Sequence, residues 1–423
     1  MPRLLYIAAG VVGLLVLILI LALAGVGRKE LAPDLASLEF WGIEDDEEVW
    51  RKVIDEFRKE YSHITVTYRR FPADSYEETL VNRLAEGKGP DVFVLKNSWV
   101  AKHRDKIFPL PAESNPLPSS ELKRIFADDP ATALLAPKGE LLGLPIFIDS
   151  LALFYNKDIF DGVGIAQPPA TWEAATEISR RLTKTLPSGD ISRSGMALGT
   201  GKNIAHAFEI LSAMFLQRGE AIISQNGRVI ELGRSAEEAL AFYASFADPS
   251  GKNFSWTGRM PPSLDAFATG QVVMAIGFSS DIKRIRAKNP HLNFGISPLP
   301  QTGGSQPSRT SASYFFPTVS RLSKNPSPAW QFIFWVSGAG GARVYQAVSG
   351  RPPARRDLIT AGGKSETEQV FFKQALTARS WPIPDEAPSQ RIFVEAIDSV
   401  VSRAATPSQA LSRLQRQLQL LLP

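Results

Sequence analysis

The stretch GLPIFIDSLALFYNKDIF, residues 143–160, decides the fold of this chain. It begins with a Gly-Leu-Pro break and continues as two apolar runs of the kind that form buried strands. One carboxylate, Asp149, stands between the two runs. An acid in this position indicates a crossover between two lobes, with a polar group facing the cleft between them. Taken alone, these residues fit an ordinary core strand with a solvated Asp at a bend even better.

Length and composition point to a globular protein with two domains. The chain has 423 residues, of which 44% are apolar and 21% are charged. Its 47 Lys and Arg residues nearly balance 43 Asp and Glu residues, and the basic residues are scattered, which excludes a nucleic-acid surface. Cysteine is absent, so disulfides, thiolate metal sites and lipid attachment at a cysteine are excluded.

The N-terminal segment predicts a membrane anchor. Residues 4–26 carry no charge and are long enough to span the roughly 30 Å of a bilayer's hydrocarbon core as a helix. Ala22-Leu23-Ala24 fits a cleavage site, so a signal peptide is the alternative. We expect residues 1–30 to be an N-terminal transmembrane helix or uncleaved signal. The body, residues 31–423, is then extracytoplasmic on a single-pass protein of the cell membrane.

Strands alternate with helices in the first part of the body. Strand-like runs at 37–42, 64–70 and 92–95 are separated by helical patterns, which predicts an α/β unit with a parallel sheet. Ligands bind such sheets beyond the carboxyl ends of the strands. Trp41 ends the first run and Asn97 follows the third, each next to small or polar residues.

No catalytic or cofactor motif is present. The four histidines lack metal-ligand spacing, and no HExxH, GxSxG or dinucleotide fingerprint occurs. Residues 195–203 fail as a phosphate loop because Asn203 stands where Ser or Thr should bind magnesium. The acidic run 44–48 is explained by helix capping, and a calcium site there needs further ligands. Asp45 and Asp149 are a conceivable glycosidase pair, but nothing in the sequence indicates that they converge.

Aromatic residues beside Asn, Ser or Asp recur at strand ends. Aromatic rings stack on the C–H faces of sugar rings, while amides and carboxylates bind the hydroxyl groups. The pattern therefore favours binding of a polar, ring-shaped solute over catalysis.

The order of motifs resembles the extracellular solute-binding proteins of ABC importers, in the sugar-binding group that includes the maltose-binding protein. The resemblance runs from about Leu38 to the C-terminus. It rests on LEFWG at 38–42, GKGPDVFVL at 87–95, GLPIFIDSLALFYNKDIF at 143–160, PPATW at 168–172, DAFATGQVVMAIG at 265–277, FGISPLP at 294–300, AWQFIFWV at 329–336 and RPPARRDL at 351–358.

The resemblance implies an α/β, two-lobed periplasmic-binding-protein-like fold with a hinge and an interlobe cleft. We expect lobe 1 at about 34–145 and 280–325, and lobe 2 at about 150–277 and 326–423. Asp149 matches the position of a cleft glutamate in the family. The candidate ligand-binding residues are Trp41, Glu44, Asp45, Asn97, Ser98, Asp149, Asn203, Phe278, Ser280, Tyr314 and Trp381.

Two departures from the family bear on the ligand and the anchor. An aromatic residue often follows the Met-Ala-Ile-Gly strand, but Ser280 stands there and Phe278 is the nearest substitute. The lipidated cysteine of many relatives is missing, and residues 4–26 replace it.

The resemblance also implies the partners. We expect a mono- or oligosaccharide ligand, ABC permease subunits, and no cofactor, metal or nucleic acid. A glycan-acting enzyme, or a receptor or sensor for a non-sugar solute on the same frame, is the alternative.

Overall fold

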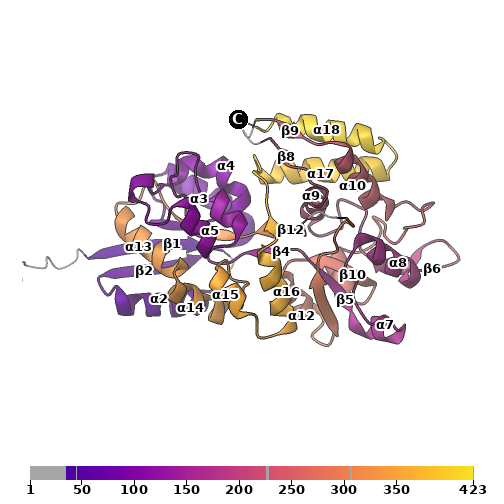
Figure 1. The fold of residues 1–423 in the computed structure, drawn as a ribbon, viewed down its shortest axis with the longest axis horizontal. Coiled ribbons are helices and arrows are strands. Elements are labelled where there is room, and N and C mark those ends of the chain that lie inside the picture. The colour runs from indigo at the N-terminus through magenta and orange to yellow at the C-terminus, as the bar shows by residue number, and fades with distance from the viewer. Residues whose placement is uncertain (1–34, 44, 225–227, 305–306, 423) are drawn as a thin grey trace, which may run out of the picture.

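Two lobes, each with its own sheet, lie side by side along the long axis of the molecule (Figure 1). The computed structural model describes residues 35–43, 45–224, 228–304 and 307–422. The expected anchor at residues 1–30 lies outside these residues. Within the described part, no helix combines the length and the apolar character needed to cross a membrane.

The first lobe is built on a four-stranded sheet in the order β13-β3-β1-β2. Strand β1 pairs in parallel with β2 and β3, while β13 is antiparallel to β3. Helix α2 buries Trp50, Val53, Ile54 and Phe57 along one face, as the spacing of its apolar residues predicts. The elements are β1 (Ala36–Gly42), α2 (Glu47–Glu60), β2 (Ile64–Arg70), α3 (Ala73–Ala85), β3 (Val92–Lys96), η1 (Asn97–Trp99), α4 (Val100–His103), η2 (Arg104–Lys106), η3 (Ala112–Ser114), α5 (Ser119–Ile125), α6 (Asp128–Ala133), β13 (Phe315–Val319), α13 (Pro326–Ser337), α14 (Ala339–Ser349) and α15 (Arg356–Ala361).

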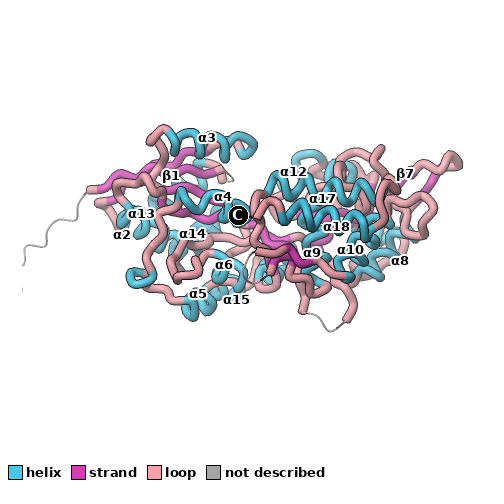
Figure 2. The backbone as a smooth tube through the Cα atoms, turned by 90° about the horizontal axis from the view of Figure 1, so that it is seen from above, coloured by secondary structure: helices cyan, strands magenta, loops and turns pink. Residues whose placement is uncertain are grey.

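The second lobe is built on a five-stranded sheet in the order β11-β5-β10-β7-β6. Strand β10 is buried along its whole length and pairs with β5 and β7. Figure 2 shows α9, α10, α17 and α18 gathered on this lobe. The elements are β5 (Ala152–Asn156), α7 (Lys157–Gly162), α8 (Trp172–Leu182), β6 (Lys184–Thr185), β7 (Ile191–Met196), α9 (Ala207–Gln217), β8 (Ile222–Ile223), β9 (Ile230–Glu231), α10 (Arg234–Ser245), α11 (Ser263–Ala268), β10 (Val272–Gly277), α12 (Asp281–Lys288), β11 (Phe294–Pro298), α16 (Glu366–Ala375), α17 (Glu386–Val401) and α18 (Pro407–Gln419).

A small sheet joins the lobes. Its order is β14-β12-β4, with β4 at Asp149–Ser150, β12 at Thr310–Ser313 and β14 at Ala378–Arg379. Strand β4 leads directly into β5 of the second lobe, so residues 143–160 form the crossover that the sequence predicts. The chain thus passes between the lobes at three places, and β4 and β12 lie between them in Figure 1.

The structure divides the chain differently from the predicted lobe boundaries. Strand β11 falls in the segment 280–325 expected in lobe 1, but it pairs with β5 in the second lobe. Helices α13 and α14, expected in lobe 2, bury Phe332 and Tyr345 in the core of the first lobe. Both helices carry apolar faces that fit either core, so the sequence alone did not indicate which sheet they cover.

Candidate functional site

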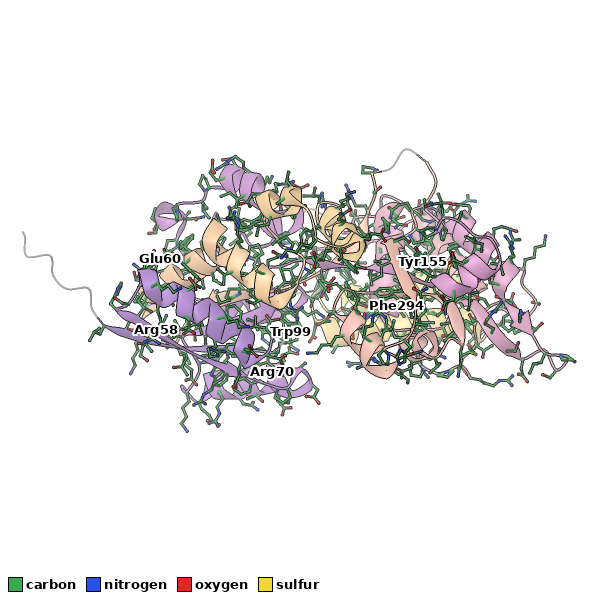
Figure 3. All side chains as sticks on the ribbon, turned by 90° about the horizontal axis from the view of Figure 1, so that it is seen from below. Arg58, Glu60, Arg70, Trp99, Tyr155 and Phe294 are labelled. Atoms are coloured by element: carbon green, nitrogen blue, oxygen red, sulfur yellow. The ribbon has the colours of Figure 1, made fainter. Side chains whose placement is uncertain are left out.

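A cavity of about 770 Å³ lies between the lobes. The first lobe contributes the start of α2 and the turn after α14, the second lobe contributes α12, and α16 lies against both. We call this space the outer cavity. Its charged lining includes Asp45, Asp46, Arg70, Lys283, Arg284 and Arg351. Figure 3 shows Arg70 on the first lobe.

Asp45 is held in place by two donors on the first lobe. Its Oδ2 accepts a hydrogen bond of 2.6 Å from the Tyr345 hydroxyl, and its Oδ1 accepts one of 2.8 Å from Arg351 Nε. The Arg351 guanidinium also lies over the Phe147 ring, 4.5 Å from its centroid. Both partners of the ion pair are largely buried, so the carboxylate has a fixed direction at the wall of the outer cavity.

Asp149 is fully engaged with protein groups. Its two oxygens accept hydrogen bonds from Ser150 N (2.8 Å), Ser279 N (2.9 Å), Ser279 Oγ (2.8 Å) and Ser280 N (3.1 Å). Burial raises the pKa of this carboxyl group, while the hydrogen bonds from Ser279 oppose the increase. A carboxylate has about four acceptor positions, so Asp149 orients the Ser279–Ser280 loop, and this loop lines the outer cavity.

A second, smaller space of about 20 Å³ lies between β3, α9 and the start of α17. We call it the inner cavity. Lys96 Nζ and Glu386 Oε1 lie 2.5 Å apart across it, and Glu386 Oε2 accepts a hydrogen bond of 2.6 Å from Trp99 Nε1. In Figure 3, Trp99 lies on the side of the first lobe that faces the second. The polar lining also includes Glu209 of α9 and the serines Ser212, Ser311, Ser313 and Ser380.

Three predicted residues line the inner cavity: Asn97, Ser98 and Trp381. Asn97 Oδ1 accepts a hydrogen bond of 3.2 Å from Tyr314 N. The buried Ser98 Oγ has no hydrogen-bond partner among the described residues. Trp381 Nε1 donates to Ser212 Oγ at 3.4 Å. Asp45 and Ser280 line the outer cavity, so five of the predicted residues fall into two groups.

Four other predicted residues, besides Asp149, line neither cavity. Trp41 is buried and donates from Nε1 to Glu39 Oε1 at 3.0 Å. Asn203 binds two backbone carbonyl groups and accepts from Trp256 Nε1, so it holds a loop together. Phe278 packs against the His206 ring, and burial raises the pKa of the Tyr314 hydroxyl well above its usual value. The remaining candidate, Glu44, lies outside the described residues.

His206 was not predicted as a functional residue. Its Nε2 lies 2.8 Å from Asp281 Oδ2, which also accepts a hydrogen bond from Phe278 N. Burial lowers the pKa of His206, but the hydrogen bond and charge of Asp281 outweigh it and the pKa is raised overall. His206 also has a φ of 61°, in the left-handed region. The imidazole therefore ties the start of α9 to α12 behind the Ser279–Ser280 loop.

Glu386 was not predicted as a functional residue either, although its partner Lys96 lies at a strand end that the sequence marks as a candidate binding region. The partners stand 290 positions apart, and no local pattern marks Glu386 as different from any acid near a helix start. Only the fold brings the two together.

The comparisons with known proteins agree with this architecture. The model of the family described as bacterial extracellular solute-binding protein matches residues 42–343. A Brucella abortus protein described as a binding protein is 25% identical over 248 residues, which are 58% of this chain and 57% of that protein's length. The sn-glycerol-3-phosphate-binding periplasmic protein of Escherichia coli K12 is 24% identical over 296 residues, which are 64% of this chain and 65% of that protein's length.

Solved structures share the fold over nearly the whole body. A cyclo/maltodextrin-binding protein complexed with maltotetraose has a TM-score of 0.75 at 21% identity, covering 93% of this chain and 98% of its own. The sugar-binding protein MalE from Xanthomonas citri has a TM-score of 0.74 at 20% identity, and the match covers 91% of this chain and 97% of that one.

Proposed function

Because the chain belongs to the family of bacterial extracellular solute-binding proteins, which bind solutes and are not enzymes, we propose that it captures a carbohydrate outside the cytoplasm. The bound solute is then handed to the permease of an ABC importer. The lobes close on the solute by bending at the three-stranded sheet, as hinged binding proteins do. The sugar-binding proteins named above, which share its fold, support this choice of ligand.

The outer cavity is the observation that carries the proposal. Its volume of about 770 Å³ falls within the range of about 300–1,000 Å³ typical of small-molecule sites. Hydroxyl, carboxylate and guanidinium groups surround it, and these groups bind sugar hydroxyls. We assign Asp45 and Ser280 to ligand contact there, and Asn97, Ser98 and Trp381 to contact at the inner cavity.

The charges of the outer cavity favour a neutral solute over an anion. Arg351 pairs with Asp45 at 2.8 Å, and Arg70 pairs with Asp46 at 2.6 Å. Lys283 also reaches Asp46, at 3.5 Å, and Arg284 pairs with Asp265 at 3.0 Å. Arg70 and Lys283 share one carboxylate and the other two cations have one each, so an anionic solute must compete with an existing partner. A neutral polyol disturbs none of the pairs.

A thermal-shift experiment on the full chain tests the ligand class. The probes are maltotetraose, mannobiose, D-tagatose and sn-glycerol-3-phosphate. We expect at least one neutral saccharide to raise the melting temperature, because a ligand at 100 times its Kd stabilises the folded state by about 2.7 kcal/mol. Stabilisation by sn-glycerol-3-phosphate alone would contradict the carbohydrate assignment and favour an anion receptor.

The membrane anchor at residues 1–30 is part of the same proposal. The uncharged run at residues 4–26 supports it, and an anchored receptor stays close to its permease. N-terminal sequencing of the protein isolated from whole cells tests it. An N-terminus after Ala24 would mean that the segment is a cleaved signal peptide.

A further inference from the structure

The ion pair between Lys96 and Glu386 joins the two lobes at the inner cavity. Lys96 ends β3 of the first lobe, and Glu386 begins α17 of the second. The two side chains are only 20% and 11% exposed, and Glu386 also accepts the Trp99 indole hydrogen bond. A buried pair of this kind requires that every charged atom keep a polar partner.

A buried hydroxyl next to this pair is left without a partner. Ser98 is 4% exposed and lines the inner cavity, and its Oγ makes no hydrogen bond to any described residue. A buried hydroxyl without a partner costs free energy. The cavity of about 20 Å³ has room for one group the size of a water or hydroxyl, which needs roughly 10–15 Å³.

We infer that Lys96, Ser98 and Glu386 form an inner subsite that binds one hydroxyl group of the solute. This inference rests on the proposed carbohydrate-binding function. A hydroxyl group donates to the Glu386 carboxylate and accepts from the Lys96 ammonium, so it inserts between the two charges without unpairing either. The same hydroxyl group can accept a second hydrogen bond, and it gives Ser98 Oγ the partner that it lacks. As the lobes part and close again, the direct ion pair becomes one bridged by the solute.

The charges of the subsite favour a neutral hydroxyl group over an anion. The lining holds one cation, Lys96, and two carboxylates, Glu209 and Glu386, and an anionic ligand group would compete with Glu386 for Lys96. That exchange leaves the buried Glu386 carboxylate uncompensated, which is strongly unfavourable. Neutral hydroxyl groups avoid this cost because each can serve as donor and acceptor.

A neighbouring ion pair provides a matched control. Lys102 Nζ and Asp385 Oδ2 also join the lobes, 3.1 Å apart. These side chains are more exposed, at 38% and 29%, and neither lines the inner cavity. Asp385 and Glu386 are adjacent in sequence, so substituting each in turn separates a general effect on lobe closure from an effect on solute contact.

The experiment compares Glu386→Gln, Ser98→Ala and Asp385→Asn in the full chain. Saccharide binding is measured by calorimetry with maltotetraose, mannobiose and D-tagatose, and melting temperatures are measured without saccharide. We expect Glu386→Gln and Ser98→Ala each to weaken binding about tenfold or more, equivalent to about 1.4 kcal/mol. Asp385→Asn should change the Kd by less than about twofold. Ser98→Ala keeps the ion pair, so its unliganded melting temperature should not fall, and it remains informative if Glu386→Gln folds poorly.

Three outcomes would overturn the inference. If saccharide binding is unchanged in Glu386→Gln and Ser98→Ala, the inner subsite does not exist, while the proposed function stands. If Asp385→Asn weakens binding as much as Glu386→Gln, the inner pair acts only through closure. If the wild-type chain binds none of the three saccharides, the proposed function and the inner subsite both fail.

Discussion

The carboxylate of Asp149 accepts two hydrogen bonds from Ser279, one from its amide at 2.9 Å and one from its hydroxyl at 2.8 Å. Asp149 lies on a linking strand, and Ser279 lies in the loop that begins α12 of the second lobe. The acid expected to meet the solute therefore sets the position of a loop that lines the outer cavity.

Replacing Asp149 by Ala should destabilise the protein strongly. The substitution leaves the amide groups of Ser279 and Ser280 without their acceptor in a buried region, and we expect a loss of about 2–4 kcal/mol. Urea unfolding of the full chain measures it. Asp161→Ala, at an exposed position, is the control and should change the free energy of unfolding by less than about 0.5 kcal/mol. Equal losses in both variants would contradict the role of Asp149.

Removing Arg351 should cost more than removing Arg70, although both line the outer cavity. Arg351→Met takes the ionic partner from the buried Asp45 carboxylate, so we expect a loss of about 3 kcal/mol or more. Arg70→Met breaks a pair with an exposed Asp46 and should cost less than about 1 kcal/mol. Chemical denaturation distinguishes them, and a reversed order would mean that the Asp45 pair is not structurally important.

His206 should make stability depend on pH near neutrality. Its pKa is raised above the usual 6.5 in the folded protein. The stabilisation of the folded state by protonated His206 is therefore complete below about pH 6.5. It is lost as the pH rises through the pKa of His206 in the folded protein. The control is His206→Asn, because Asn tolerates the left-handed backbone found there. We expect the stability advantage of the wild type over this variant to shrink between pH 6 and pH 8. A constant advantage would contradict the prediction.

Trp41→Ala should lower the stability of the folded protein and not only weaken ligand binding. The indole is 3% exposed and packs on Phe71 with ring centroids 4.5 Å apart. Loss of a buried tryptophan side chain typically costs about 3–5 kcal/mol. Thermal melting measures the effect. Trp41→Phe retains most of the packing and should recover much of the lost stability.

Local patterns predicted the elements and the crossover but not the partnerships across the molecule. The spacing of Trp50, Val53 and Phe57 predicts the buried face of α2, and all three are buried. The run at residues 143–160 predicts β4 and β5. The partner of Asp149, by contrast, depends on how the second lobe meets the first, and its serines lie 130 positions away. The same holds for Lys96 and Glu386. Hydrophobic periodicity shows which face of an element is buried, but it does not identify the other element that covers that face.

The three passages of the chain between the lobes also determine the order in which the protein can fold. Strand β13 completes the first sheet only after the second-lobe strands β5, β7, β10 and β11 have been synthesised, because it begins at Phe315. Helix α13 then covers that sheet from residues 326–337. Contacts between such distant segments slow folding. A growing chain that has emerged only as far as residue 300 therefore lacks a finished core in its first lobe, which keeps it unfolded for longer during synthesis.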